Sequence, residues 1–423
     1  MTPTTDPQPN DPQDASRDVL VGRRMLLKSG LIVGATTAVG ASLGFLTERR
    51  TAAPSVQEAK PTFNVFGSET AEFHGVVQPG IVSRHQANLL MMAFTVREGQ
   101  TPQDAQRMLR VLTQDAERLM AGKGGLADND RELAQYPAGL TVTVGVGPHF
   151  FDRFGMPERK PHWLQDLPAY RIDQLQERWC GGDLIIQICG DDQIALSNSR
   201  RLFVSQLRSW ASLRWLQDGF SGARHSRPEG ETPRNLMGQV DGTVNPAVTQ
   251  DNPQVFMENA GVWNGGSTLV IRRIMMILDT WEEVDRVARE DVIGRRIDSG
   301  APLSGVHEHD EPDFDARGPL GFEKIAPYSH VRRARSENSN ERIFRRSYNY
   351  DNAPESGQAH NTGLVFLSYQ ASIVDQYMPI QQRLADLDAL NEWTVPIGSA
   401  VCAILPGCRE GEYLGQRIIE QAL

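Results

Sequence analysis

The chain has 423 residues, of which 39% are apolar and 23% are charged, a composition typical of a globular protein. Its formal net charge of −10 argues against nucleic acid as a partner, because a protein that neutralises phosphates needs a basic face. The length, less a leader of about 60 residues, allows two domains of ordinary size.

A twin-arginine leader is the first feature in chain order. Arg23 and Arg24 are followed by the uncharged stretch Gly30–Leu46, which is rich in Gly, Ala and Thr. This pattern predicts export by the twin-arginine machinery to the periplasm, the cell envelope or the medium. A retained membrane anchor is the less favoured alternative, since the stretch is only weakly apolar and barely reaches the ~17–25 residues that a spanning helix needs. Two alternative cleavage sites are left open, one around Ala41 and the other at Thr51–Pro54.

In the first half of the mature chain, an apolar run predicts a strand and a capped segment predicts a helix. Leu89–Val96 (LLMMAFTV) is the strand, and Thr101-Pro102 begins the helix, with apolar residues repeating on one face as far as residue 119. Threonine is a good helix cap, and proline is tolerated at the first helical position. Further strands are expected at residues 140–146 and 184–188.

The second half repeats this order of elements. Leu269–Leu278 predicts a strand, and Thr280–Glu283 resembles a capping box that begins a helix through Val292. Strands are also expected at residues 364–369 and 400–405. Because the strands outnumber the helices, we expect an α+β fold of two domains joined near residue 250.

The four cysteines, Cys180, Cys189, Cys402 and Cys408, form no C-x-x-C pair. Most of them are therefore expected to be small buried residues. Export permits a disulfide, but a protein that folds before export is less expected to form one.

Three short motifs carry candidate chemistry. Asp241 stands in Gly238–Thr243 (GQVDGT), His330 stands in SHVRRA, and Arg345 follows the apolar pair Ile343-Phe344. Taken alone, each has a plain alternative: Asp-Gly forms ordinary turns, a single histidine among nine is usually packed or exposed, and an arginine in a basic stretch usually forms solvated salt bridges. Together they supply an imidazole, a carboxylate and a guanidinium, the groups needed to split a peroxide on a haem iron.

These motifs, in this order, resemble the dye-decolorising (DyP-type) peroxidase family. The resemblance extends from about Phe73 onward. Matching segments are Gly75–Ile81, Gly181–Gly190, Arg234–Pro246, Gly294–Pro302 and Gly363–Gln370. The leader and the RRSYNY segment are similar to the exported bacterial branch, which includes enzymes called deferrochelatases.

The family resemblance implies a fold and a cofactor. It implies two ferredoxin-like domains, each an antiparallel sheet with helices on one side, and one haem b per chain held mainly by the second domain. We therefore expect residues 1–60 to be leader and linker, 61–250 the N-terminal domain and 251–423 the haem-binding domain. Residues that resemble haem contacts are Gly242, Thr243, Arg272, Leu364 and Phe366, with a surface arginine as the alternative for Arg272 and ordinary core packing as the alternative for Leu364 and Phe366.

The resemblance also assigns roles to the three motifs. His330 is the axial iron ligand, Asp241 the base that moves the peroxide proton, and Arg345, chosen over Arg342 and Arg346, the cation that stabilises the departing oxygen. Two positions depart from the family: Gln239 replaces a common aromatic residue, and Ser347 replaces a common glycine. The residue that accepts a hydrogen bond from His330 is not evident, and Asp375 is one guess.

Two further groups have less specific patterns. His307–Glu311 (HEHDE) has enough nitrogen and oxygen ligands for a metal, although such acidic loops are usually just solvated or make structural contacts. Four aromatic residues near the surface are candidates for carrying oxidising equivalents outward, although most are expected to be packing residues: Trp163, Trp281, Tyr348 and Tyr350.

The sequence thus favours an exported haem peroxidase that reduces hydrogen peroxide and oxidises dyes, phenolics or other one-electron donors. Because a carboxylate base, with an ordinary pKa of ~3.9, works at a lower pH than a histidine does, an acidic optimum is expected. The alternatives are a deferrochelatase, which releases iron and leaves the porphyrin intact, and a haem carrier without turnover. The identity of the organic donor and the formation of a homo-oligomer are left open.

Overall fold

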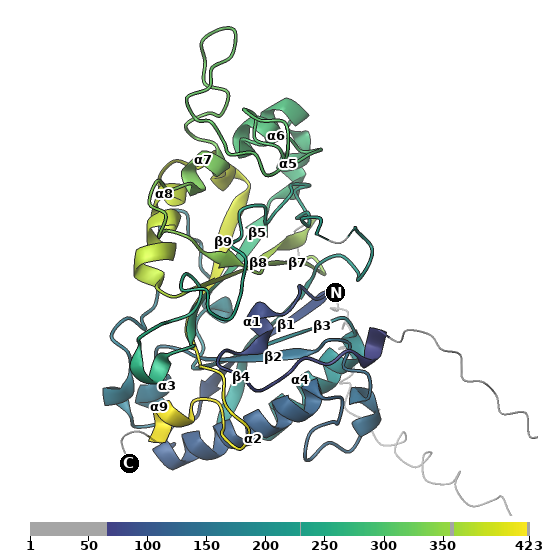
Figure 1. Ribbon diagram of the computed structural model, residues 1–423, viewed down its shortest axis with the longest axis vertical. Helices are drawn as coiled ribbons and strands as arrows, with labels where there is room; N and C mark the ends of the chain where they lie inside the picture. The colour runs from purple at the N-terminus through teal and green to yellow at the C-terminus, as the bar shows by residue number, and fades with distance from the viewer. Residues whose placement is uncertain (1–65, 229, 356–358, 421–423) are drawn as a thin grey trace, which may run out of the picture. The chain divides into compact units, whose positions relative to one another are not determined.

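The computed structural model describes residues 66–228, 230–355 and 359–420 (Figure 1). The leader predicted for residues 1–60 lies outside these ranges. All of the described residues belong to one unit, Phe63–Leu423. Among them, no helix has both the length and the apolar character needed to cross a membrane. The domain boundary expected near residue 250 stays a prediction.

Four antiparallel strands from the first half of the chain form one sheet. They are β1 (Asn88–Val96), β2 (Thr141–Val146), β3 (Leu184–Gly190) and β4 (Ala211–Phe220). Strand β1 pairs with β3 on one side and with β4 on the other, and β3 also pairs with β2. The expected strands β1, β2 and β3 are confirmed, whereas β4 was missed.

The second half forms a similar antiparallel sheet. Its strands are β5 (Ser267–Met276), β6 (Phe344–Arg345), β7 (Tyr348–Asn352), β8 (Asn361–Gln370) and β9 (Thr394–Ile404). Strand β5 pairs with β8 and β9, and β8 also pairs with β6 and β7. Strands β5, β8 and β9 were predicted, and β6 and β7 were not.

Two short contacts join these sheets edge to edge. Strand β2 pairs with β9 through Gly145↔Ile404, and β4 pairs with β7 through Phe220↔Asn349. The strand pairings therefore close on themselves. The α+β class and the antiparallel sheets with helices, as expected for ferredoxin-like halves, are confirmed.

The closed arrangement explains why β1 is apolar at every position from Leu89 to Phe94. Its alternate residues Leu90, Met92 and Phe94 pack against the helices, whereas Leu89 and Met91 pack in the core shared with the second sheet. A strand buried on both faces reads as a continuous hydrophobic run, because successive side chains point to opposite faces.

Two helices cover the outer face of the first sheet, α2 (Pro102–Met120) and α4 (Gln193–Leu207) (Figure 1). Helix α2 begins as predicted: the Thr101 side chain accepts a hydrogen bond from the Asp104 backbone N–H, and Asp104 accepts one from the Thr101 backbone in return. Short helices also form at α1 (Pro79–Val82), α3 (Phe150–Arg153) and α9 (Gln416–Glu420).

The prediction of one helix that begins at Thr280 and runs through Val292 is wrong about where the helix begins. Thr280 lies inside the short helix α5 (Leu278–Glu283), and a separate helix, α6 (Arg286–Ile293), follows it. Asp285 caps α6 by accepting hydrogen bonds from the backbone N–H groups of Val287 and Ala288 at 2.9 and 3.1 Å. An aspartate N-cap next to the helix dipole therefore determines where this helix begins.

The second half also has two helices that pack together, α7 (His330–Ala334) and α8 (Met378–Leu387). A single turn of π-helix, Ile373–Tyr377, leads into α8. Its first turn is capped by Ser372, whose hydroxyl also donates a hydrogen bond to the Asp375 carboxylate at 2.7 Å.

The burial of side chains corrects one expectation about aromatic residues and confirms another about cysteines. Trp281, Tyr348 and Tyr350 are each only 1% exposed, so the expectation that they lie near the surface is wrong. Trp163 is partly buried against the core. The cysteines are all free, and Cys189, Cys402 and Cys408 are buried, as expected of small core residues.

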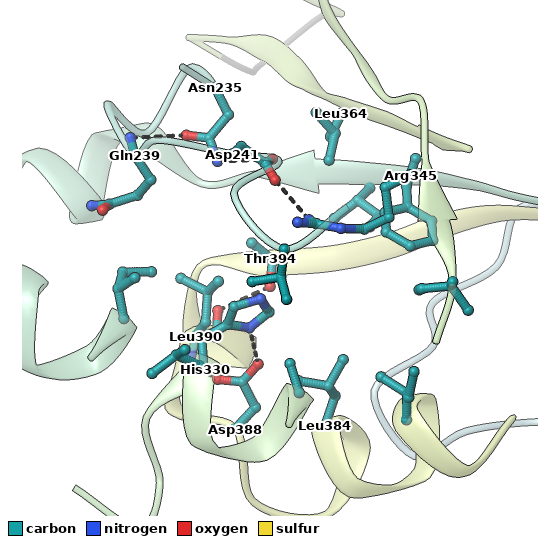
Figure 2. A pocket seen from close by; sticks show the side chains of 18 of the residues that line it. Asn235, Gln239, Asp241, His330, Arg345, Leu364, Leu384, Asp388, Leu390 and Thr394 are labelled. Carbon is teal, nitrogen blue, oxygen red and sulfur yellow. Dashed lines mark hydrogen bonds and ion pairs between the residues drawn. The ribbon is translucent and has the colours of Figure 1, made fainter. Parts of the chain in front are cut away.

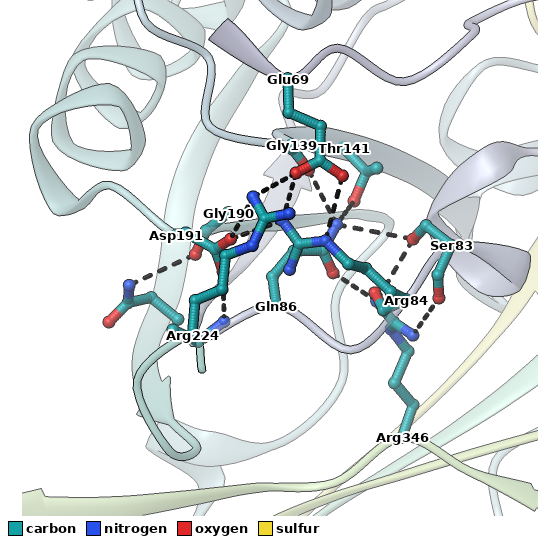
Figure 3. Close-up of polar contacts among 12 residues, drawn as sticks. Glu69, Ser83, Arg84, Gln86, Gly139, Thr141, Gly190, Asp191, Arg224 and Arg346 are labelled. Atoms are coloured by element: carbon teal, nitrogen blue, oxygen red, sulfur yellow. Dashed lines mark hydrogen bonds and ion pairs between the residues drawn. The ribbon is translucent and has the colours of Figure 1, made fainter. Parts of the chain in front are cut away.

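A polar network supports the segment Ser83–Gln86 (Figure 3). The Arg84 guanidinium donates to Glu69 at 3.0 and 3.1 Å and to Asp191 at 2.5 Å. The hydrogen bond from Arg84 holds the pKa of Glu69 below its ordinary value. Arg346, which is 2% exposed, donates to the Ser83 and Arg84 carbonyl groups at 2.9 and 2.7 Å. The network therefore anchors the chain immediately after Arg345.

Candidate active site

One cavity of about 270 Å³ brings together every site residue predicted from the sequence. Strands β5, β6 and β8, the loop after Asn235 and helices α7 and α8 contribute its walls. The predicted residues that line it are Asp241, Gly242, Thr243, Arg272, His330, Arg345, Leu364 and Phe366. Segments separated by more than 100 residues thus converge on one space.

His330 lies on one side of this cavity, at the first residue of α7 (Figure 2). Its Nδ1 atom is 2.6 Å from Asp388 Oδ2, and the Asp388 side chain is only 3% exposed. A carboxylate accepts hydrogen bonds, so Nδ1 is the donor and carries a proton. The guess that Asp375 is the partner of His330 is therefore wrong, because Asp375 accepts from Ser372 instead.

This contact sets the electronic character of the imidazole. Burial lowers the pKa of His330, but the charge and hydrogen bond of Asp388 outweigh it and raise the pKa above its ordinary value. The His330 side chain is 35% exposed, and Nε2 has no hydrogen-bond partner among the described residues. With its Nδ1 fixed and its Nε2 free, the ring is oriented as a metal-ligating histidine is.

Asp241 and Arg345 lie on the opposite side of the cavity (Figure 2). Arg345 donates a hydrogen bond to Asp241 Oδ1 at 2.6 Å, and Asn235 approaches Oδ2 at 3.4 Å. Both members of the pair are partly exposed, Asp241 at 19% and Arg345 at 26%. The carboxylate and the guanidinium are therefore accessible to a small molecule in the cavity.

The backbone around Asp241 explains the two glycines. Gly238 and Gly242 have φ values of +83° and +135°, which residues other than glycine rarely adopt. The Asp241 N–H donates to the Pro233 carbonyl at 2.8 Å, and Arg234 and Val240 form an antiparallel bridge. Asp241 therefore stands at the end of a tight, hydrogen-bonded loop, and the surface-turn alternative is wrong.

The three candidate arginines of the RIFRR segment have different environments. Arg345 pairs with Asp241, whereas Arg346 is directed into the buried network around Ser83. Arg342 also lines the cavity and has no carboxylate within 4.0 Å among the described residues. The choice of Arg345 as the residue beside Asp241 agrees with this geometry.

Arg272 is a buried residue, so the surface-arginine alternative is wrong. Its side chain is 1% exposed and forms an ion pair with Asp173, which is 6% exposed. The Nε of Arg272 is buried without a hydrogen-bond partner among the described residues. Its charge is thus already balanced by Asp173, and its buried Nε–H is left without an acceptor among the described residues.

Arg295 is a further cavity residue that the sequence reasoning did not single out. It is 8% exposed, and its guanidinium donates to the carbonyl groups of Gly300 and Glu308 at 2.7 and 2.8 Å. Burial lowers the pKa of Arg295, but an arginine retains its charge in proteins. Within the described part of the chain, no carboxylate lies within 4.0 Å to balance that charge.

A second cavity, of about 420 Å³, adjoins the first. Asp241 and Arg345 line both, so their ion pair forms part of the wall between them. The second cavity is also lined by Ser347 and Asn349, whose Oγ and Oδ1 atoms are buried without a partner among the described residues. Such atoms favour a site for water or another small hydrogen-bonding molecule.

The acidic segment His307–Glu311 makes structural contacts. The Glu308 carboxylate accepts from the Thr243 hydroxyl at 2.9 Å, and Asp310 accepts from two backbone N–H groups of its own loop. Nowhere in the described ranges do three or more His, Cys, Asp or Glu side chains converge as metal ligands would. The metal hypothesis for this segment thus has no support in the structure.

Comparisons with known proteins agree on one family. Models of the Dyp-type peroxidase N-terminal and C-terminal domains match residues 78–221 and 232–409. A dye-decolorizing peroxidase of Thermobifida fusca is 36% identical, over 92% of this chain and 95% of the relative. A deferrochelatase of Yersinia pseudotuberculosis is 32% identical, over 94% of each chain. The crystal structure of a DyP-type peroxidase from Cellulomonas bogoriensis has 44% identity and a TM-score of 0.82, covering 84% of this chain and 99% of that one.

The chain belongs to the DyP-type peroxidase family. It is therefore a haem peroxidase. The cavity fits that cofactor on its own evidence. An oriented imidazole presents its Nε2, and apolar side chains such as Leu364, Phe366 and Ile274 line the walls. The buried Arg295 guanidinium, which has no carboxylate partner among the described residues, suits an acid group of a porphyrin.

Replacing Asp388 with asparagine tests the role of its hydrogen bond. Asp388 Oδ2 accepts from His330, and its Oδ1 accepts from the Leu390 N–H at 2.9 Å. The single oxygen of an amide serves only one of these donors and is a weaker acceptor. We expect Asp388→Asn to retain haem but to raise the reduction potential of the iron, measured by spectroelectrochemistry, because the imidazole becomes less basic. A potential unchanged from that of the wild type would contradict this role.

Proposed function

We propose that this protein is an exported peroxidase that binds one haem b per chain and oxidises dyes, phenolics or similar donors at the expense of hydrogen peroxide. One observation carries the proposal: the His330–Asp388 pair and the Asp241–Arg345 pair face each other across a single cavity. Such an arrangement provides a metal ligand on one side and an acid–base group with a fixed cation on the other.

The His330 side supports the cofactor. When bound, haem supplies the iron at which the peroxide O–O bond is cleaved and from which oxidising equivalents pass to the donor. Nε2 of His330 is the nitrogen available to the iron, and Asp388 keeps the proton on Nδ1. Gly242 has no side chain to obstruct the porphyrin, and Leu364 and Phe366 provide apolar contacts.

Arginine residues are suited to hold the carboxylates of the porphyrin. The sequence suggested Arg272, but Asp173 already balances its charge. Arg295 and Arg342 line the same cavity without a carboxylate partner in the described ranges. We therefore assign the main electrostatic contact to Arg295, the more buried of these two, and a hydrogen bond from Nε at most to Arg272.

Asp241 and Arg345 act on the peroxide. The Asp241 carboxylate accepts the proton from one peroxide oxygen and returns it to the other, so that the departing oxygen leaves as water. Arg345 is held 2.6 Å from Asp241 and stabilises the negative charge that develops on the departing oxygen. The second cavity offers peroxide and water a polar route to this pair that is distinct from the main cavity.

Asp241→Asn tests the base directly. The amide keeps the size of the side chain but cannot take up the proton, so the rate constant for reaction with hydrogen peroxide should fall by about 100-fold or more. Stopped-flow absorption measures this rate, and the haem spectrum shows that the cofactor is retained.

We also expect the wild-type enzyme to oxidise dyes fastest at acidic pH, since a carboxylate base remains ionised well below neutrality. Loss of haem from Asp241→Asn, or an optimum above pH ~7, would argue against Asp241 as the base.

Iron release is the second candidate function, and the likeness to deferrochelatases favours it. It requires the same haem-binding residues, so the site geometry alone fits both activities. In this case, haem-loaded protein incubated with a reductant and an iron chelator should yield fluorescent, iron-free porphyrin. A fluorescence trace that stays flat while dye oxidation proceeds would favour the peroxidase.

Export is proposed from the leader sequence, which lies outside the described residues. The twin-arginine route carries folded proteins, which suits a chain that takes up its cofactor in the cytoplasm. Changing Arg23 and Arg24 to lysine in the full chain should retain the protein, with its haem, in the cytoplasm of a bacterial host. Cell fractionation and immunoblotting measure this, and unimpaired export of the double variant would refute it.

A further inference from the structure

The side chain of Asn245 lies where the loop that carries Asp241 meets the strand that carries Arg345. Asn245 Oδ1 accepts a hydrogen bond from the Arg345 backbone N–H at 3.0 Å. Its Nδ2 donates one to the Arg345 carbonyl oxygen at 2.7 Å. The amide thus pairs with both backbone polar groups of one residue, as a neighbouring strand would.

Arg345 needs such a partner because β6 is a two-residue strand. On one side β6 pairs with β8 through Arg345↔Ser368, and the next N–H, that of Arg346, donates to the Leu367 carbonyl at 2.9 Å. Backbone groups of successive residues point to opposite sides of a strand, so the N–H and C=O of Arg345 point away from β8. Asn245 satisfies both of them.

Asn245 is also tied to Asp241 through a short loop. Its own backbone N–H donates to the Gly242 carbonyl at 3.0 Å, and the following Pro246 disfavours a helical conformation at Asn245. The Asp241 and Arg345 side chains are joined in turn at 2.6 Å. The contacts therefore form a closed ring from Asp241 to Arg345, from Arg345 to Asn245, and along the chain back to Asp241.

We propose that Asn245 is a positioning residue for the reaction with peroxide. It fixes the backbone of Arg345 relative to the loop of Asp241, and so sets the separation of the guanidinium from the carboxylate that moves the proton. It acts through these two residues and does not itself transfer a proton. The inference rests on the proposed roles of Asp241 and Arg345, and it adds a residue that the sequence motifs did not single out.

Two substitutions of Asn245 test this role. Asn245→Ala removes both hydrogen bonds, and the isosteric Asn245→Asp keeps the acceptor for the Arg345 N–H but places an oxygen against the Arg345 carbonyl. Both should lower the stopped-flow rate constant for hydrogen peroxide by about 10-fold or more, since small misplacements of reacting groups are costly. The KM for the organic donor should not change, because the donor does not depend on the Asp241–Arg345 separation.

A double-mutant cycle separates positioning from a general structural effect. In the Asp241→Asn background, Asn245→Ala should lower the peroxide rate constant by less than about 2-fold, because the group through which it acts is already disabled. Asn252→Ala is the matched control. The Asn252 side chain also bonds to the backbone through both of its polar atoms: Nδ2 donates to the Ala247 carbonyl at 2.7 Å, and Oδ1 accepts from the Gln254 N–H at 2.9 Å. None of these hydrogen bonds involves Asp241 or Arg345. Asn252→Ala should leave the peroxide rate constant unchanged.

Hydrogen–deuterium exchange of the haem-free protein provides a readout independent of turnover. The Arg345 amide should exchange faster in Asn245→Ala than in the wild type, and at the wild-type rate in Asn252→Ala. If Asn245→Ala does not retain haem, Asn245→Asp decides by the same kinetic criteria, and loss of haem from both variants would overturn the proposal in favour of a structural role.

The other outcomes are also decisive. Wild-type peroxide kinetics in both Asn245 variants, or an equal loss with and without Asp241→Asn, would overturn the positioning role while leaving the base role of Asp241 intact. Normal kinetics of Asp241→Asn itself would instead refute the proposed base, and the positioning role with it. The two failures are therefore distinguishable.

Discussion

The ion pair between Asp241 and Arg345 depends on a fold that brings a loop against a strand about 100 residues away in sequence. A tight glycine-flanked loop presents the carboxylate, and a two-residue strand presents the guanidinium. Neither the loop nor the strand is long enough to hold the Asp241 or Arg345 side chain in place by its own contacts. The pair is therefore maintained by what lies around it: strand β8 on one side of Arg345, the Asn245 amide on the other, and the buried Arg346 immediately after it.

The same cavity must also bind a large, flat, mostly apolar cofactor while keeping several charges near it. The structure meets this requirement by pairing most of the charges internally. Asp388 balances His330, Asp173 balances Arg272, and Asp241 balances Arg345, each through a direct contact. Arg295 is left without a carboxylate partner in the described ranges, which supports the proposal that it contacts an acid group of the cofactor.

The sequence predicted the cavity residues better than their partners. The motifs around Asp241, His330 and Arg345 are local, so a resemblance identifies them without knowledge of the fold. Asp388 is 58 residues from His330 and is brought to it by the packing of α7 on α8, which no local pattern encodes, and the guess of Asp375 failed for that reason. Asn245 lies in the matching segment Arg234–Pro246, but its proposed role follows from contacts with the backbone of a residue 100 positions away.

In the fold, too, local patterns were predicted from the sequence and features that depend on long-range contacts were not. Strands buried on both faces, such as β1, are evident as continuous apolar runs, and helix α2 is evident from its cap. Strand β4 was missed because its burial does not follow its apolar residues: Gln217 is buried, whereas Leu213 and Phe220 are exposed. Strand β6 is only two residues long and is defined by its pairing with β8. The buried positions of Tyr348 and Tyr350 follow from the closure of the two sheets, which sequence patterns do not reveal.

The most direct test of the account mixes leaderless, haem-loaded protein with one equivalent of hydrogen peroxide at mildly acidic pH in a stopped-flow absorption spectrometer. We expect the ferric spectrum to change rapidly and to return when a reducing dye is added, with the dye bleached in proportion to the peroxide. A ferric spectrum that persists in the presence of peroxide, with no dye oxidised, would contradict the assignment of this site as a peroxidase centre.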